Sequence, residues 1–182
     1  DGGGAVGAAP VWGAGDDLSL QGPRVRIEPV AAEHRERLGE LRADPGVRRW
    51  WQEPRDDLLA DEPDVHKYAV RHDGQLIGFV QWSEVTDPMY RHAAVDLFIG
   101  DDFQGQGLGT EIVRVVCAHL IDEHDFHRIV IDPEATNEVA IACYRKVGFR
   151  PVGVMRRYQR DRFGEWQDGL LMDLLADELV RG

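Results

Sequence analysis

The chain has 182 residues, of which 43% are hydrophobic and 30% are charged, and its formal net charge is −12. This length allows one domain with its own core and is too short for two ordinary domains. The negative charge argues against a nucleic-acid partner, which needs a basic surface, and it favours a cationic small molecule that long-range attraction can steer. No apolar run approaches the roughly 20 residues that span a bilayer, and no secretory signal is visible. We therefore expect a cytoplasmic protein that does not bind membranes.

The first 22 residues are rich in glycine and alanine and have no hydrophobic periodicity. This composition predicts a flexible tail over residues 1–22, followed by a single domain over residues 23–182. The two cysteines, Cys117 and Cys143, are too few for a disulfide scaffold and have no metal-ligand partner at close spacing. We expect them to be reduced thiols and expect no bound metal. The oligomeric state, monomer or homodimer, stays open.

Hydrophobic periodicity and turn residues predict alternating strands and helices along the domain. The Asp73-Gly74 pair is a strong hairpin signal, and Gly148 fits the position just past the end of a helix. In chain order we expect a strand over 24–29, a helix over 31–43, a short helix or turn over 47–51, strands over 66–71, 75–83 and 93–99, a helix over 107–124, a strand over 128–131, a helix over 137–146, and strands over 149–158 and 166–175. A mixed sheet with helices on both faces is the natural way to pack this order.

One glycine-rich turn stands out between the strand over 93–99 and the helix that starts near Leu108. It reads Gln104-Gly105-Gln106-Gly107-Leu108-Gly109-Thr110. A glycine-rich turn that leads into a helix points backbone N–H groups outward at the positive end of the helix dipole, which suits a phosphate. The spacing differs from a P-loop and from the dinucleotide-binding fingerprint. A simple turn remains the alternative for a motif this short.

A second motif follows the glycine-rich turn. Residues 132–149 read D-P-x-x-x-N-x-x-A-I-x-C-Y-x-K-x-G-F. Together the two motifs resemble the second half of the GCN5-related N-acetyltransferases (GNAT), and more narrowly the aminoglycoside 6′-N-acetyltransferases. The Trp50-Trp51 pair is similar to a tryptophan pair near the substrate site of that subfamily. The resemblance covers roughly residues 24–175.

The resemblance implies the GNAT fold, which is an α/β (α+β) architecture. Its sheet is mixed and mostly antiparallel, has about six or seven strands, and contains a central parallel pair that splays apart. Here the splayed strands would be the one ending near Gly100 and the one around Val130. The resemblance also implies acetyl-CoA as co-substrate, with its pantetheine arm in the wedge between these strands and its pyrophosphate on the glycine-rich turn. The implied cofactor-binding residues are Leu97, Phe98, Ile99, Gln104, Gly105, Gln106, Gly107, Leu108, Gly109, Thr110, Asn137, Ala140 and Tyr144.

Two residues are the candidates for catalysis. Asp96 is a charged residue inside an apolar strand, which is costly unless the side chain is exposed or used. The resemblance implies that Asp96 holds the acceptor ammonium or takes its proton, and that Tyr144 protonates the leaving thiolate. Tyr144 lies two helical turns after Asn137 and so on nearly the same helix face. The alternatives are a core tyrosine and, for Asn137, a helix N-cap rather than a pantetheine contact.

The candidate substrate-binding residues are Trp50, Trp51, Asp96, Asp132 and Asp168. Aromatic faces stack on sugar rings and attract ammonium groups, although at least one of the two tryptophans is expected to pack inward. Asp132 can instead form the turn before a proline, and an acid after a turn, like Asp168, is commonplace. Five acidic residues form either an anionic rim for a polycation or a solvated loop. They are Glu53, Asp56, Asp57, Asp61 and Glu62.

The sequence therefore predicts an acetyl-CoA-dependent N-acetyltransferase that acetylates the 6′-amine of aminoglycoside antibiotics, with drug resistance as a consequence. We expect direct transfer in a ternary complex, in which backbone N–H groups near Leu97 and Phe98 polarise the thioester carbonyl. The alternatives are another acceptor, namely a polyamine, a hydroxylysine-type siderophore precursor or a protein N-terminus, and a non-catalytic module that binds acyl-CoA.

Overall fold

The computed structural model describes residues 19–51 and 58–182. Residues 1–18 of the predicted tail lie outside these ranges, and so do Glu53, Asp56 and Asp57 of the predicted acidic rim. The predicted flexible tail over residues 1–22 includes two residues that already belong to the sheet. Leu20–Gln21 form a short strand, β1, because their backbone pairs with the next strand, β2.

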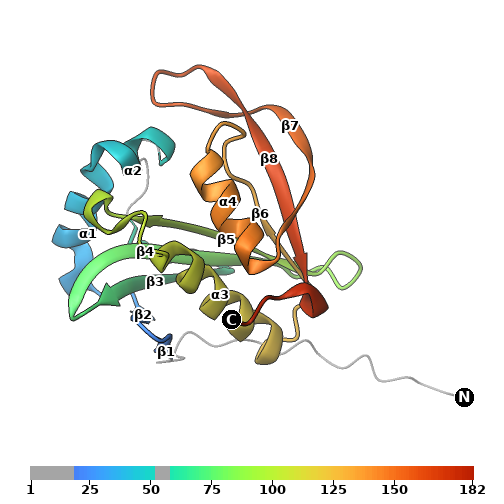
Figure 1. The fold of residues 1–182 in the computed structure, drawn as a ribbon, viewed down its shortest axis with the longest axis horizontal. Helices are drawn as coiled ribbons and strands as arrows, with labels where there is room; N and C mark the ends of the chain where they lie inside the picture. The colour runs from blue at the N-terminus through green and yellow to red at the C-terminus, as the bar shows by residue number, and fades with distance from the viewer. Residues whose placement is uncertain (1–18, 52–57) are drawn as a thin grey trace, which may run out of the picture.

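The described strands form one eight-stranded sheet in the order β1-β2-β3-β4-β5-β6-β8-β7 (Figure 1). Every neighbouring pair is antiparallel except β5 and β6, which run parallel. The predicted mixed, mostly antiparallel sheet is confirmed, and it has more strands than the six or seven expected. After β1, the bounds are β2 Val25–Pro29, β3 Val65–His72, β4 Gln75–Val85, β5 His92–Ile99, β6 Arg128–Ile131, β7 Arg150–Arg160 and β8 Trp166–Leu175.

Helices cover both faces of the sheet, as the sequence predicts. The helices are α1 Arg35–Ala43, α2 Pro45–Trp50, α3 Leu108–Asp122 and α4 Glu138–Val147, with single 3₁₀ turns over Ala32–His34, Asp101–Phe103 and Ala176–Glu178. One face packs against α3 and α4 in the larger core, and the other packs against α1 and α2 in a smaller one. No helix in the described ranges is long and apolar enough to cross a membrane.

The helix predicted over residues 31–43 is divided in the structure. Its first turn is the 3₁₀ turn, and α1 starts only at Arg35. It ends at Ala43 as expected, because the residue before a proline disfavours helical backbone. Pro45 then occupies the first position of α2, where its missing N–H costs nothing. This arrangement packs Val47 of α2, and Trp51 just after the helix, against the sheet in the smaller core.

Strands β5 and β6 separate after a short contact. They pair only at Ala93 with Ile129 and at Ala94 with Val130, and β5 then continues alone to Ile99. The predicted splayed parallel pair is thus confirmed. The second half of β5 keeps its pairing with β4 and has an open edge on the other side. An open strand edge carries N–H and C=O groups that need partners, so this wedge is the natural place to look for a ligand.

Candidate active site

The direction of each peptide along β5 decides which residues face the wedge. The N–H of Gly100 donates to the Ile77 oxygen of β4 over 2.9 Å. Because hydrogen-bonded pairs alternate along an antiparallel ladder, Phe98, which lies opposite Phe79, also turns its peptide toward β4. The backbone N–H and C=O groups of Leu97 and Ile99 therefore point toward the wedge. The Phe98 N–H points to the opposite side of the strand, so the structure does not bring the Phe98 backbone to the wedge with Leu97 and Ile99, contrary to what we expected.

Most of the polar groups on the wedge edge already have partners in the free protein. The Trp51 indole Nε1 donates to the Leu97 oxygen, and the Gln104 side-chain amide donates to the Ile99 oxygen, each over 2.9 Å. The Leu97 N–H donates to Oδ1 of Asp96, also over 2.9 Å. The N–H group that we expected to polarise the thioester carbonyl thus already donates a hydrogen bond to the Asp96 carboxylate.

The glycine-rich turn has the geometry of an anion site. Gly105 and Gly107 adopt left-handed backbone, with φ of 73° and 78°, a region that favours glycine. Within the described part of the chain, the N–H groups of Gly105, Gln106 and Gly107 have no hydrogen-bond partner. The first N–H groups of α3 also lack partners inside the helix. Successive free N–H groups of this kind form a concave anion-binding surface, so the residues fit a pyrophosphate.

Helix α4 borders the same wedge and is capped at both ends. The Asn137 side chain accepts a hydrogen bond from the Ala140 N–H over 3.2 Å, so Asn137 is the N-cap and Ala140 belongs to the first turn. Among the described residues, the Asn137 amide nitrogen has no hydrogen-bond partner. Further along, Cys143 Sγ lies 3.3 Å from Thr110 Oγ1, which joins α4 to the start of α3. Tyr144 is buried in the larger core.

Asp96 and Asp132 both line a cavity of about 220 Å³ beside the wedge. The Asp96 side chain is exposed to solvent, but the protein around the cavity removes part of the hydration of its carboxyl. This desolvation, together with the negative charge of Asp132, raises the pKa of Asp96 to about 7. The cavity is lined by Arg42, Trp51, Leu58, Glu62, Val65, Lys67, Gln81, Ser83, Ala94, Val95, Asp96 and Asp132.

Both tyrosines near these acids hold their protons firmly. Desolvation, reinforced by the charge of Asp96, raises the pKa of Tyr144 well above its ordinary value. Tyr158 donates a hydrogen bond to Asp132, and this bond raises its pKa to about 12. The structure therefore gathers two carboxyls and two phenols around the wedge. Sequence reasoning missed Tyr158, because only the long β7–β8 hairpin brings it back over β6.

The two tryptophans have different environments. Trp51 packs edge-on against Phe98 and Phe79, with ring centroids 5.0 and 6.0 Å away, and it lines the cavity. This confirms that one member of the pair packs inward. Trp50 stacks under the guanidinium of Arg49, whose Cζ is 4.6 Å from the ring centroid, and it does not line the cavity. The structure thus brings only Trp51 to the two acids.

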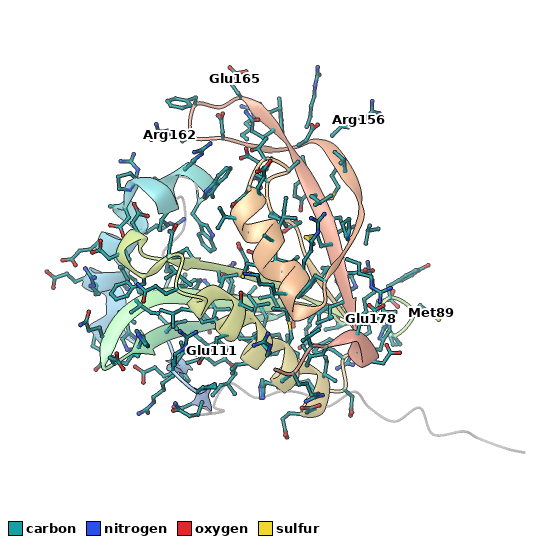
Figure 2. The ribbon with its side chains drawn as sticks, viewed as in Figure 1. Met89, Glu111, Arg156, Arg162, Glu165 and Glu178 are labelled. Atoms are coloured by element: carbon teal, nitrogen blue, oxygen red, sulfur yellow. The ribbon has the colours of Figure 1, made fainter. Side chains whose placement is uncertain are left out.

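The Asp168 side chain bonds to the backbone of β7 and does not line the cavity. Its carboxylate accepts from the Arg157 N–H over 2.7 Å. Arg157 has a φ of 51°, within the irregular pairing between β7 and β8. Asp168 is absent from the lining of the cavity, so the prediction that it contacts the substrate is not supported by its position. In Figure 2, Arg162 and Glu165 mark the far tip of this hairpin, which projects beyond the sheet.

Two basic residues in the cavity were not predicted. Lys67 forms an ion pair with Glu62 and also donates to the Ala60 oxygen over 2.8 Å, so its charge is balanced. The Arg42 guanidinium lies 5.5 Å from the centroid of the Trp51 ring. When both are ionised, the carboxylates of Asp96 and Asp132 outnumber the one guanidinium, that of Arg42, among the described residues that line the cavity. The inner cavity therefore favours a cation.

Comparison with known proteins agrees with this geometry. Residues 29–149 match the model of the acetyltransferase (GNAT) family. The spermidine N(1)-acetyltransferase of Escherichia coli (strain K12) is 27% identical over 139 residues, which cover 71% of this chain and 74% of that protein. The aminoglycoside N(6′)-acetyltransferase type 1 of Klebsiella pneumoniae is 34% identical over 110 residues, which cover 54% of this chain and 53% of that protein.

The fold is also that of solved structures. The structure of Mycobacterium smegmatis RimJ in complex with CoA-disulfide superposes with a TM-score of 0.77 and 23% sequence identity, covering 89% of this chain and 88% of that chain. The family match spans well over half of the 182 residues. The chain therefore belongs to the GNAT family of acetyltransferases.

Proposed function

We propose that this protein transfers the acetyl group of acetyl-CoA directly to a primary amine of a cationic small molecule. The observation that carries the proposal is the position of Asp96. Its carboxyl has a pKa of about 7, lies beside Asp132 in the cavity, and touches the open edge of β5 through the Leu97 N–H. A carboxyl with this pKa can both attract an ammonium group and accept its proton near neutral pH.

The same wedge supplies the groups that acetyl-CoA needs. We assign the pyrophosphate to the free N–H groups of the glycine-rich turn, and the pantetheine amides to the open edge of β5 at Ile99 and to the Asn137 side chain. Acetyl-CoA supplies an acyl group that is activated as a thioester. The protein holds this group at the end of the wedge, where an amine can reach it.

Asp96 can act in two linked ways. The acceptor amine must lose a proton before it can attack, and Asp96 is a cavity carboxyl that lies on β5 itself, the strand that borders the wedge. When Asp96 turns from the Leu97 N–H to the incoming ammonium, that N–H becomes free to donate to the thioester carbonyl. Arrival of the amine thus uncovers the donor. We assign to Tyr144, whose phenol carries its proton at neutral pH, the transfer of a proton to the leaving thiolate.

The first candidate acceptor is the 6′-amine of an aminoglycoside. Support comes from the 34% identical relative, from the two carboxylates, and from Trp51 in the cavity wall. Cavities that enclose a whole drug-sized ligand are roughly 300–1,000 Å³. A cavity of about 220 Å³ therefore fits one aminosugar ring, with the rest of the molecule outside. Antibiotic resistance would follow from this choice of substrate.

A polyamine is the second candidate. The relative named as a spermidine N(1)-acetyltransferase aligns over a longer stretch, 139 residues against 110. A terminal ammonium on a flexible chain also suits the two cavity carboxylates, and it needs no aromatic wall.

A thiol-release assay with acetyl-CoA against a panel of amines tests the proposal. The panel contains kanamycin, tobramycin, spermidine, lysine, an alanine-starting peptide, and paromomycin, which has a hydroxyl at the 6′ position. We expect turnover on drugs that carry a 6′-amine and none on paromomycin. Turnover on spermidine alone would replace the first candidate by the second. Equal turnover on paromomycin would exclude the 6′-amine as the site of transfer.

A further inference from the structure

The segment before β2 is bonded to the start of α3. The buried carboxylate of Glu111, in the first turn of α3, accepts hydrogen bonds from the N–H groups of Arg24 (2.6 Å) and Val25 (3.1 Å). It also forms an ion pair with Nε of Arg24 over 2.8 Å. Figure 2 labels Glu111 at this end of α3, near the N-terminal strands. Arg24 precedes residue 29, where the family match begins, so the family pattern assigns it no role.

Arg24 also reaches the glycine-rich turn itself. Its Nη1 donates to the backbone oxygen of Gln106 over 3.0 Å. In a trans peptide the C=O of one residue and the N–H of the next point in opposite directions. Because Arg24 holds the Gln106 oxygen, the N–H of Gly107 is turned away from Arg24, to the open side of the turn. A peptide flip at this position would remove one donor from the anion site.

The charge of Glu111 needs compensation at this position. A carboxylate in the first turn of α3 lies close to where a pyrophosphate would bind, and two like charges repel. Burial opposes the ionisation of Glu111, but the hydrogen bonds from Arg24 and Val25 outweigh it and hold the pKa of Glu111 below its ordinary value. The carboxylate is therefore ionised, and the Arg24 guanidinium is the charge that offsets it. Loss of Arg24 would leave a negative charge behind the anion site.

We propose that Arg24 is a positioning residue for acetyl-CoA, which orients the Gln106–Gly107 peptide and neutralises Glu111 so that the turn can bind the pyrophosphate. The inference rests on the proposed function, because it needs acetyl-CoA to bind at this turn. Only the affinity for the pyrophosphate should depend on Arg24, because this is the part of acetyl-CoA that would contact the turn. Pantetheine would bind further along the wedge, away from Arg24.

The test compares two ligands on the same protein. Isothermal titration measures Kd for acetyl-CoA and for acetyl-pantetheine, which lacks the pyrophosphate, with wild type, Arg24→Ala and Arg26→Ala. Arg26 is a matched control, because it is an exposed arginine on the same segment whose partners are Glu28 and Ser19. We expect Arg24→Ala to weaken acetyl-CoA binding about tenfold or more while acetyl-pantetheine changes less than about twofold. Arg26→Ala should change neither.

Three results would overturn the inference. They are an unchanged Kd for acetyl-CoA in Arg24→Ala, an equal loss for both ligands, and a similar loss in Arg26→Ala. If Arg24→Ala does not fold, Arg24→Lys carries the same comparison. A lysine retains the charge but lacks the planar fork that reaches Glu111 and Gln106 together. A wild-type protein that bound neither ligand would instead contradict the proposed function.

Discussion

The Asp96 carboxyl lies between an attractive and a repulsive neighbour. It accepts a hydrogen bond from the Leu97 N–H, and Asp132 lines the same cavity. Desolvation and the second carboxylate raise its pKa to about 7. The residue is therefore about half ionised near neutral pH, which is the condition in which a general base works best. Two predictions concern this residue.

Asp96→Asn should lower kcat/KM by about 10²-fold or more if Asp96 is the base. In the wild type the carboxylate is the active form, so kcat/KM should rise as pH increases through about 7, and this inflection should disappear in the variant. A pH–rate profile of both proteins measures the effect. Asp73→Asn, in the exposed β3–β4 turn, is the matched control. A loss below about threefold in Asp96→Asn would exclude the role of base.

The same substitution should stabilise the fold at alkaline pH. The pKa of Asp96 is raised in the folded state from its ordinary value of 3.8 to about 7, so between pH 3.8 and about pH 7 the folded protein binds more protons than the unfolded chain. Stability therefore falls as pH rises through this window, and the cost is fully present above about pH 7. Melting curves at pH 5 and pH 8 should show that Asp96→Asn gains in Tm, relative to wild type, at the higher pH. An equal shift at both values would show that the carboxyl is not desolvated.

The sequence predicted which residues meet at the site more successfully than it predicted their hydrogen bonds. Asp96, Asp132, Trp51 and Tyr144 do meet around the wedge, because their positions follow from a motif and from strand order. The details that depend on hydrogen-bond direction were not predictable. Which side of β5 the Phe98 peptide faces is set by pairing with β4.

The end of helix α4 depends on a glycine, Gly148. Helix α4 ends at Gly148, whose φ of 119° is in the left-handed region, as the sequence predicts for a residue just past a helix end. A Cβ at this position would collide with the Glu178 backbone oxygen. The C-terminal 3₁₀ turn thus packs directly on the end of the helix that carries Tyr144.

Gly148→Ala should destabilise the protein by about 2 kcal/mol or more, through left-handed strain of about 1–2 kcal/mol plus the collision. Gly39→Ala is the matched control with the opposite sign. Gly39 lies inside α1, and nothing lies within 4 Å of its Cβ position, so alanine should stabilise by about 0.5–1 kcal/mol. Urea unfolding measures both changes. A neutral result for Gly148→Ala would mean that the 3₁₀ turn can move aside freely.

Strand and helix identities were predictable because each element has a clear periodicity. The bounds of β6 and β8 agree with the prediction to the residue, and the turn at Asp73-Gly74 joins β3 to β4 as expected. The short β1 was missed, because two residues carry no periodic signal and form a strand only by pairing with β2. The contact between Arg24 and α3 was missed for a different reason, because local patterns in the sequence carry no information on distant pairs. It joins residues 87 positions apart.

At the scale of the whole molecule, the net charge of −12 acts together with the acidic cavity. A polycation would be attracted from a distance by the first and held by the second. Distant charges are screened by salt, whereas the cavity carboxylates act at short range, where screening is weak. The two contributions can therefore be separated by ionic strength.

Raising the salt concentration from about 0.05 M to about 0.5 M should raise KM for a multiply charged amine about three- to tenfold and leave kcat nearly unchanged. A monoamine substrate is the internal control and should show a much smaller increase in KM. Steady-state kinetics at four or five salt concentrations measure both. If KM for the polycation does not change, the negative charge serves solubility alone.

The proposed function requires that the wedge binds acetyl-CoA and that its acetyl group is transferred to an amine. The most direct measurement follows free thiol and N-acetylated product together, in one reaction with acetyl-CoA and a saturating polyamine or aminoglycoside. We expect one thiol released for each amine acetylated, little thiol without the amine, and loss of both signals in Asp96→Asn. Tight binding of acetyl-CoA with no acetylated product from any amine would contradict it and identify a module that binds acyl-CoA without catalysis.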